Sequence, residues 1–73
     1  MTNKDVNAIK DTYQPGMRIK LLKMNDIQAP PTGCKGTVKG VDDVGSVMVA
    51  WDTGSSLSVI LGEDEIEILE DLR

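Results

Sequence analysis

The chain has 73 residues, 40% of them hydrophobic and 27% charged, which excludes both a multidomain protein and an intrinsically disordered one. It has no histidine and one cysteine, so it lacks the commonest general base and cannot form an internal disulfide. The net charge of −4 combines +4 over residues 1–40 with −8 over residues 41–73, so either the two halves pair in the fold or one of them meets a charged partner.

The first fifteen residues form a segment of their own. Val6, Ile9 and Tyr13 are spaced three and four residues apart, as on one face of an amphipathic helix, and Pro15 with Gly16 ends the pattern. An isolated helix of about 12 residues is marginal in water, so this leader over residues 1–15 either docks on the rest of the chain or frays. We expect deletion of residues 1–14 to leave the remainder folded but to lower its melting temperature or change its oligomeric state.

From Met17 onward apolar residues alternate with polar ones, which is typical of half-buried strands. The alternation slips at Leu22, which indicates a β-bulge or a strong bend there. Turns rich in Gly, Pro and Asp separate five predicted strands, which cover residues 17–24, 36–41, 46–52, 56–61 and 66–68. This pattern predicts an all-β fold, a small five-stranded SH3-like barrel over residues 16–69, followed by a tail over residues 70–73.

Three stretches of this region carry a resemblance to a known family. They cover residues 18–26, 33–38 and 49–57, and the most distinctive part is Trp-Asp-x-Gly-Ser at 51–55 followed by Gly-x-Asp-Glu at 62–65. Over about residues 16–68 the chain resembles short bacterial and phage proteins of domain of unknown function family 4314. The resemblance implies a gene carried by a bacterium, its phages or mobile elements, and it implies no established activity.

The residues do not assemble into a catalytic or metal-binding pattern. Cys34 has neither a histidine base nor a second cysteine beside it, so a plain thiol is expected. The acidic run at residues 63–65 lacks the register of a calcium loop and is expected to be a solvated surface. We therefore expect no catalytic residues, no metal and no cofactor, and a protein that is not an enzyme.

Trp51 allows two interpretations. It shares a strand face with Val47 and Val49, which favours packing in the core. An exposed indole beside a polar turn would instead stack on a peptide or a base.

A second set of candidates is a basic face formed by Arg18, Lys20 and Lys39. Basic side chains on one sheet face could bind nucleic acid. If the first and last strands pair, however, Arg18 and Lys20 face Glu67 and its acidic neighbours as cross-strand ion pairs, and the pattern favours this second interpretation.

The leading hypothesis is a non-enzymatic binding module for a protein partner. Its predicted surface is a groove between the loops at residues 25–33, 42–45 and 52–55, with Ile27, Gln28, Asp43 and Thr53 as candidate contacts. The alternatives are nucleic-acid binding through the basic face and an acidic inhibitor that mimics nucleic acid. No apolar run approaches the roughly 18 residues of a membrane span, and the start does not resemble a signal peptide, so we expect a cytoplasmic monomer or weak homodimer without membrane contact.

Overall fold

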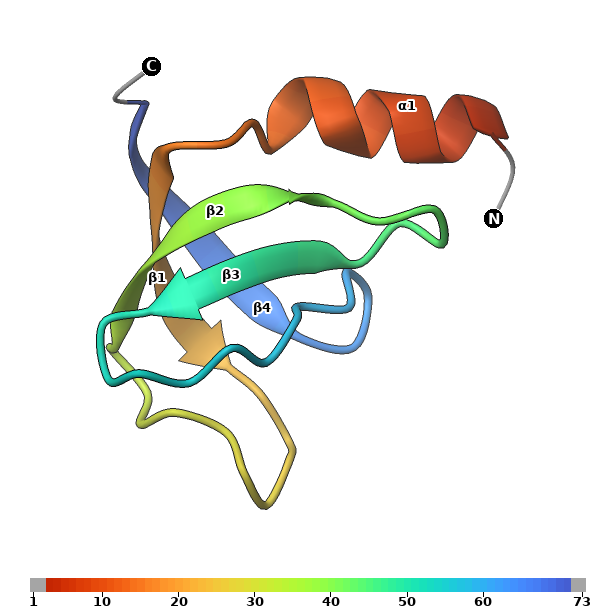
Figure 1. Cartoon of the computed structure of the whole chain (residues 1–73). Helices are drawn as coiled ribbons and strands as arrows, with labels where there is room; N and C mark the ends of the chain where they lie inside the picture. The colour runs from red at the N-terminus through yellow and green to blue at the C-terminus, as the bar shows by residue number, and fades with distance from the viewer. Residues whose placement is uncertain (1–2, 72–73) are drawn as a thin grey trace.

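The computed structural model describes residues 3–71, which form one helix and one four-stranded antiparallel sheet (Figure 1). The elements are α1 (Asn3–Thr12), β1 (Met17–Lys23), β2 (Lys35–Val41), β3 (Val47–Trp51) and β4 (Glu65–Asp71). The strand order is β3-β2-β1-β4, and the sheet does not close on itself. The prediction of an all-β, five-stranded SH3-like barrel is therefore wrong, and the fold is a β-rich α+β domain.

The predicted strand over residues 56–61 is the element that fails to form. Within it only Val59 pairs with the sheet, through two backbone hydrogen bonds with Val47 of 2.9 and 2.8 Å. The neighbouring peptide groups bond elsewhere, because the carbonyl of Leu57 accepts the Trp51 indole N–H at 2.9 Å and the Ile60 N–H donates to the Asp64 carboxylate at 2.8 Å. A single bridge cannot continue a ladder, so this segment remains a loop along the free edge of β3.

The other strands follow the sequence pattern. β1 lies between β2 and β4, so the predicted pairing of the first and last strands is confirmed. The register between β1 and β4 shifts between Leu21 and Lys23, which confirms an irregularity at Leu22. Glu70 and Asp71 of the predicted tail continue the backbone of β4, whereas residues 72–73 lie outside the described residues.

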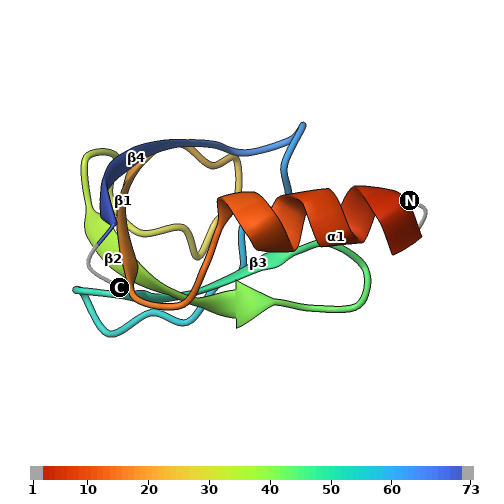
Figure 2. The same cartoon turned by 90° about the horizontal axis from the view of Figure 1, so that it is seen from above.

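The core lies on the concave face of the strongly curved sheet, where β1 and β4 face β3 (Figure 2). Buried apolar side chains from alternate strand positions and from the loop beside β3 meet there, and they are Met17, Ile19, Leu21, Val38, Val47, Val49, Trp51 and Val59. Because every second strand residue points inward, the intervening residues form a solvent-facing sheet surface.

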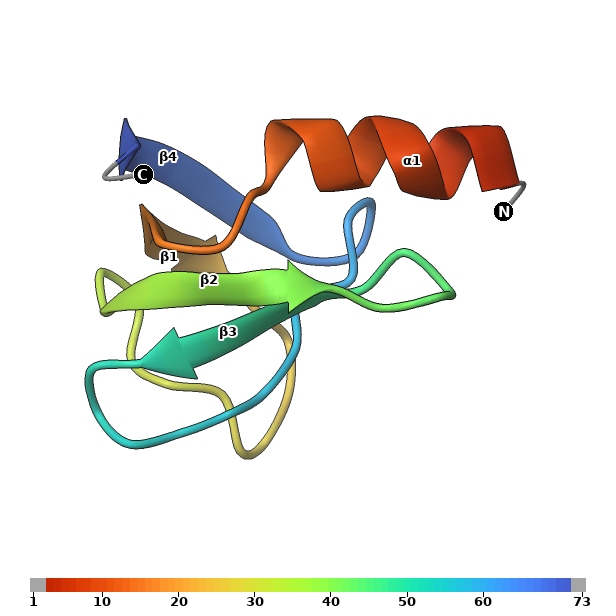
Figure 3. The same ribbon diagram turned by 45° about the horizontal axis from the view of Figure 1, so that its top comes forward.

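Helix α1 docks rather than frays, since it lies against β2 (Figure 3). Val6 is buried, and Ile9 and Tyr13 pack against the core. The Gly16 N–H donates to the Val38 carbonyl at 2.9 Å, which anchors the chain just after the helix. Within residues 3–71, no helix has the length and apolarity that crossing a lipid bilayer requires.

Deleting residues 1–14 is expected to lower the melting temperature without unfolding the sheet. The deletion removes the buried Val6 side chain and the contacts of Ile9 and Tyr13 but leaves all four strands intact. Burying one such aliphatic side chain stabilises a domain by about 1.5–3 kcal/mol, and each kcal/mol corresponds to roughly 4–8 °C at this chain length. Thermal unfolding followed by circular dichroism measures the change, and an unaltered midpoint would show that the docked helix does not stabilise the sheet.

Candidate functional site

The solvent-facing surface of β1, β2 and β3 collects the basic residues that the sequence singled out. Arg18 and Lys20 of β1 and Lys39 of β2 alternate with buried residues and point away from the core. The structure therefore brings the three predicted cations onto one face, where Lys35 joins them. We call this surface, formed by Arg18, Lys20, Lys35 and Lys39, the basic face.

Acidic residues border the basic face on both sides. Lys20 lies opposite Glu67 of β4 and opposite Lys35 of β2, and the Lys35 carbonyl accepts the Asp52 N–H at 2.9 Å. The order across the sheet is thus acidic, basic, basic, acidic. Two lysines directly opposite each other repel, and the acids on either side offset that repulsion.

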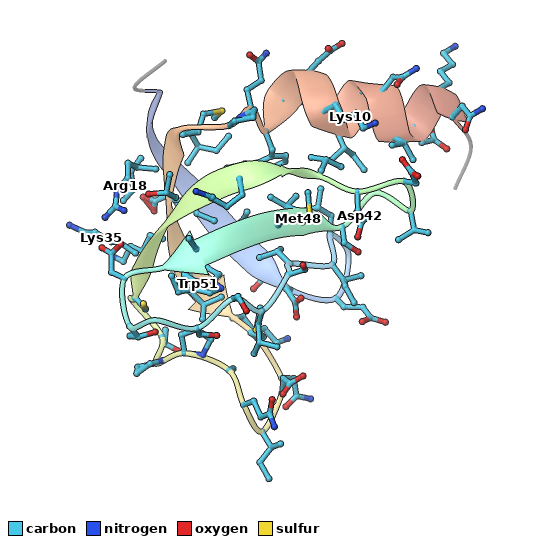
Figure 4. All side chains as sticks on the ribbon, viewed as in Figure 1. Lys10, Arg18, Lys35, Asp42, Met48 and Trp51 are labelled. Atoms are coloured by element: carbon cyan, nitrogen blue, oxygen red, sulfur yellow. The ribbon has the colours of Figure 1, made fainter. Side chains whose placement is uncertain are left out.

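Arg18 reaches across β2 to the turn that follows β3. Its guanidinium binds both carboxylate oxygens of Asp52, at 2.8 and 2.6 Å, and also donates to the Thr37 hydroxyl at 2.9 Å. Figure 4 shows Arg18 and Lys35 near the same end of the sheet, where β2 begins. Arg18 lies opposite Glu70 in the strand register, so the strand pairing behind the predicted ion pairs is confirmed, but the partner across β2 was not foreseen.

This bidentate contact sets the ionisation of Asp52. The hydrogen bond from Arg18, with the positive charges of Arg18 and Lys35, holds the pKa of the Asp52 carboxyl below its usual value of 3.8. A carboxyl group whose pKa is lower in the folded state than in the unfolded state stabilises the folded state when the pH is above the unfolded-state pKa. This stabilisation is lost as the pH falls through the folded-state pKa.

Asp52→Asn is therefore expected to destabilise the protein near neutral pH and to have little effect in strong acid. The difference in urea midpoint between the wild type and Asp52→Asn should be constant above about pH 5 and should shrink once the pH falls below 3.8. Urea titrations at a series of pH values measure this difference. Asp43→Asn, at an exposed turn residue, is the matched control, and a difference that persists at low pH would contradict the assignment.

A groove lies beside the basic face, between β3 and the loop that returns along its edge. It has a volume of about 480 Å³ and a largely apolar lining. We call it the β3 groove, and its lining includes Lys39, Met48, Ala50, Ser55, Ser56 and Ser58. The Trp51 backbone N–H donates to the Ser55 carbonyl at 2.9 Å, so one end of the returning loop is held against the strand. Figure 4 places Met48 and Trp51 along β3, from which the sheet side of the groove is built.

Sequence reasoning missed the β3 groove, although one signal for it was present. The alternation in residues 46–52 places Met48 and Ala50 on the strand face opposite Trp51, and Met48 is 38% exposed. Met48 and Ala50 thus give the outward face of β3 an apolar surface beside Lys39. The opposite wall of the groove could not be predicted, because Ser56 and Ser58 belong to the segment that was predicted to be a strand.

The four residues of the predicted partner surface do not come together. The loop of Ile27 and Gln28 joins β1 to β2, whereas Asp43 lies in the turn that joins β2 to β3. In an antiparallel sheet these two connections lie at opposite ends, so no groove contains both (Figure 1). Thr53 is exposed in the turn after β3, and that turn lies at the same end of the sheet as the loop that joins β1 to β2 (Figure 1).

Ile27 is nonetheless a distinctive residue. Its side chain is fully exposed, and the turn that presents it is ordered by a hydrogen bond of 2.8 Å from the Gln28 N–H to the Asp26 carboxylate.

Trp51, by contrast, is only 3% exposed, which confirms the interpretation that it packs in the core and excludes stacking of an exposed indole on a ligand. Cys34 is half-buried and its thiol donates to the Lys35 carbonyl at 3.4 Å.

Within the part of the chain that the structure describes, no three Cys, Asp or Glu side chains form a group that could hold a metal ion. Asp64, from the acidic run, accepts a backbone hydrogen bond from Ile60. Asp64 thus lies in the turn before β4, and Glu65 is the first residue of that strand.

The motif residues that carry the family resemblance have structural roles. Gly54 has a φ of 97° and donates its N–H to the Trp51 carbonyl at 2.9 Å, which closes the turn after β3. The Trp51 indole and the Asp64 carboxylate bind the returning loop at Leu57 and Ile60. These side chains determine the shape of the loop, and with it the shape of the β3 groove.

Two comparisons with known proteins bear on identity. Residues 2–69 match the model of a family described as Domain of unknown function (DUF4314). No curated protein matches the chain.

Proposed function

The chain belongs to the family described as Domain of unknown function (DUF4314), and we propose that it is a non-enzymatic binding module that uses the β3 groove to hold a segment of a protein partner. The observation that supports this proposal most directly is the groove itself. A volume of about 480 Å³ falls in the range of roughly 300–1,000 Å³ that is typical of ligand sites, and its apolar lining with a few polar groups fits a peptide side chain.

The chemistry of the groove supports binding rather than catalysis. The chain has no histidine, so the three serines that line the groove lack the imidazole that most often activates a serine nucleophile. Lys39, the charged residue of the lining, is exposed to solvent. An exposed lysine and serine hydroxyls provide hydrogen bonds and charge for recognition.

Nucleic-acid binding through the basic face is the weaker candidate. In its favour, Lys20 and Lys35 lie directly opposite each other, which concentrates positive charge. Against it, Arg18 is bound to Asp52, and Glu67 and Asp52 border the two lysines. Stacking on bases would need an exposed aromatic ring, and Trp51 is buried. A gel shift at low salt with single- and double-stranded DNA and RNA tests this alternative, which predicts retardation that disappears steeply as salt rises.

We further propose that the module works in the cytoplasm of a bacterium or is encoded by its phages or mobile elements. A single cysteine without a disulfide partner suits a reducing compartment.

The protein-binding proposal can be tested by selection from a random library of twelve-residue peptides. The library is screened against the wild type and against Ala50→Ile, which fills the groove with a residue that strands favour. Ala8→Ile, the same change at an exposed alanine of α1, is the matched control. We expect peptides that bind the wild type and Ala8→Ile but not Ala50→Ile. Absence of any peptide that depends on the open groove would refute the proposal.

A further inference from the structure

We propose that the segment held in the β3 groove is acidic, with at least one carboxylate placed next to an aliphatic side chain. This inference rests on the proposed function and adds the chemistry of the partner to it. It follows from the charges that surround the groove and from the residues that line it.

The apolar residues of the lining indicate what kind of partner side chain the groove binds. Met48 is 38% exposed and Ala50 is also exposed, so both present apolar surface to the groove without a covering side chain. Apolar surface of this kind is stabilised by burial against another apolar group. Methionine adapts its shape to different partners, so an aliphatic side chain of variable shape fits here.

The charged residue of the lining, Lys39, indicates which residue lies next to that aliphatic side chain in the partner. Lys39 lies at the β-bulge between β2 and β3, where the register shifts between Val38 and Gly40. Among the described residues, the lysine ammonium of Lys39 has no carboxylate within salt-bridge distance, because the one salt bridge found there joins Arg18 to Asp52. A cation beside an apolar groove is complementary to a carboxylate that follows an aliphatic residue.

The arrangement of the remaining cations points the same way. Lys20 and Lys35 belong to the basic face but not to the lining of the groove, and each already faces an acid across or along the sheet. The face therefore lacks the concentration of unbalanced charge that a polyphosphate backbone requires. The basic face is instead complementary to a peptide segment that carries a few carboxylates. Ser56 and Ser58, on the opposite wall, add hydroxyl groups that can donate to the same carboxylates.

The peptides selected on the wild type provide the test, because their composition is read directly. We expect those that require the open groove to be enriched in Asp and Glu next to Leu, Ile or Val. The strongest of them is synthesised with a fluorescent label, together with a version in which Asn and Gln replace its acids. Anisotropy titrations then compare the wild type with Lys39→Glu and with Lys10→Glu, which changes an exposed lysine of α1 outside the groove lining (Figure 4).

Reversal of charge at Lys39 should weaken binding of the acidic peptide at least tenfold, whereas Lys10→Glu should leave it unchanged. The neutral peptide should bind more weakly than the acidic one and should respond little to Lys39→Glu. Groove-dependent peptides without acids would overturn this inference while the proposed function stands. An absence of groove-dependent peptides would overturn both. Tighter binding of a twelve-nucleotide oligothymidylate, lost in Lys39→Glu, would assign the face to nucleic acid and also overturn both.

Discussion

Replacing Trp51 with alanine is expected to unfold the protein under conditions in which the wild type is stable. The indole is 3% exposed and belongs to the central core cluster. Truncation of a buried tryptophan costs about 3–5 kcal/mol, and the core of a domain this small rarely supplies more than about 3–5 kcal/mol of net stability. The cost of the substitution therefore equals the whole stability.

Trp51→Phe separates the two contributions of this side chain. Phenylalanine keeps most of the apolar ring but loses the N–H that donates to the Leu57 carbonyl at 2.9 Å. Loss of the donor leaves that carbonyl without its indole partner, which we expect to cost about 1–3 kcal/mol. The returning loop should also loosen, so Trp51→Phe should alter the β3 groove and weaken peptide binding while the sheet stays folded.

Urea unfolding followed by far-ultraviolet circular dichroism measures both variants. Ile27→Ala is the control, because a fully exposed side chain should change stability by no more than about 0.5 kcal/mol. The core assignment of Trp51 would be contradicted if Trp51→Ala unfolded with a midpoint close to that of the wild type.

Gly36→Ala is expected to have the second-largest effect, because a methyl group has no space at this position. A Cβ on Gly36 would lie 2.7 Å from Val49 Cγ1, 2.8 Å from Trp51 Cε3 and 3.2 Å from the Ala50 carbonyl oxygen. Gly36 lies directly opposite Trp51 in the register of β2 and β3, so the indole ring covers its backbone. Overpacking of this kind costs typically 1–3 kcal/mol, which is a large part of the stability of a small domain.

The double variant Gly36→Ala with Val49→Ala tests whether the cost is steric. Val49→Ala removes the Cγ1 that the new methyl group would meet, so the two changes together should cost less than the sum of each alone. Thermal melts of the four proteins complete the cycle. Gly62→Ala, where the added methyl group meets open space but φ is 97°, reports the cost of backbone strain alone. Additive effects in the cycle would show that contact with Val49 is not the cause.

Local patterns in the sequence were sufficient for several elements. The spacing of Val6, Ile9 and Tyr13 before Pro15 predicted the helical segment, and the structure places α1 at Asn3–Thr12. The alternation from Met17 predicted β1, β2 and β3 and the inward position of Trp51. These features depend on which face of a single element is buried, and the order of polar and apolar residues carries that information.

The fourth predicted strand shows where local pattern fails. Leu57, Val59 and Leu61 alternate with polar or exposed residues, yet only Val59 is fully buried and only Val59 pairs with β3. The alternation of apolar and polar residues indicates which side chains point inward. A loop that pairs with the sheet at a single residue can show the same alternation as a strand. Whether the backbone continues as a ladder depends on competing partners, which here are the Trp51 indole and the Asp64 carboxylate.

Local sequence pattern predicted the helix, the four strands that form and the core position of Trp51. Tertiary contacts, by contrast, keep the sheet open, pair Arg18 with Asp52 34 positions along the chain, and place Ile27 and Asp43 at opposite ends. The β3 groove belongs to this second group, since its walls come from β2, β3 and the returning loop. The physical reason is that each of these features depends on contacts between segments far apart in the chain, which no local periodicity encodes.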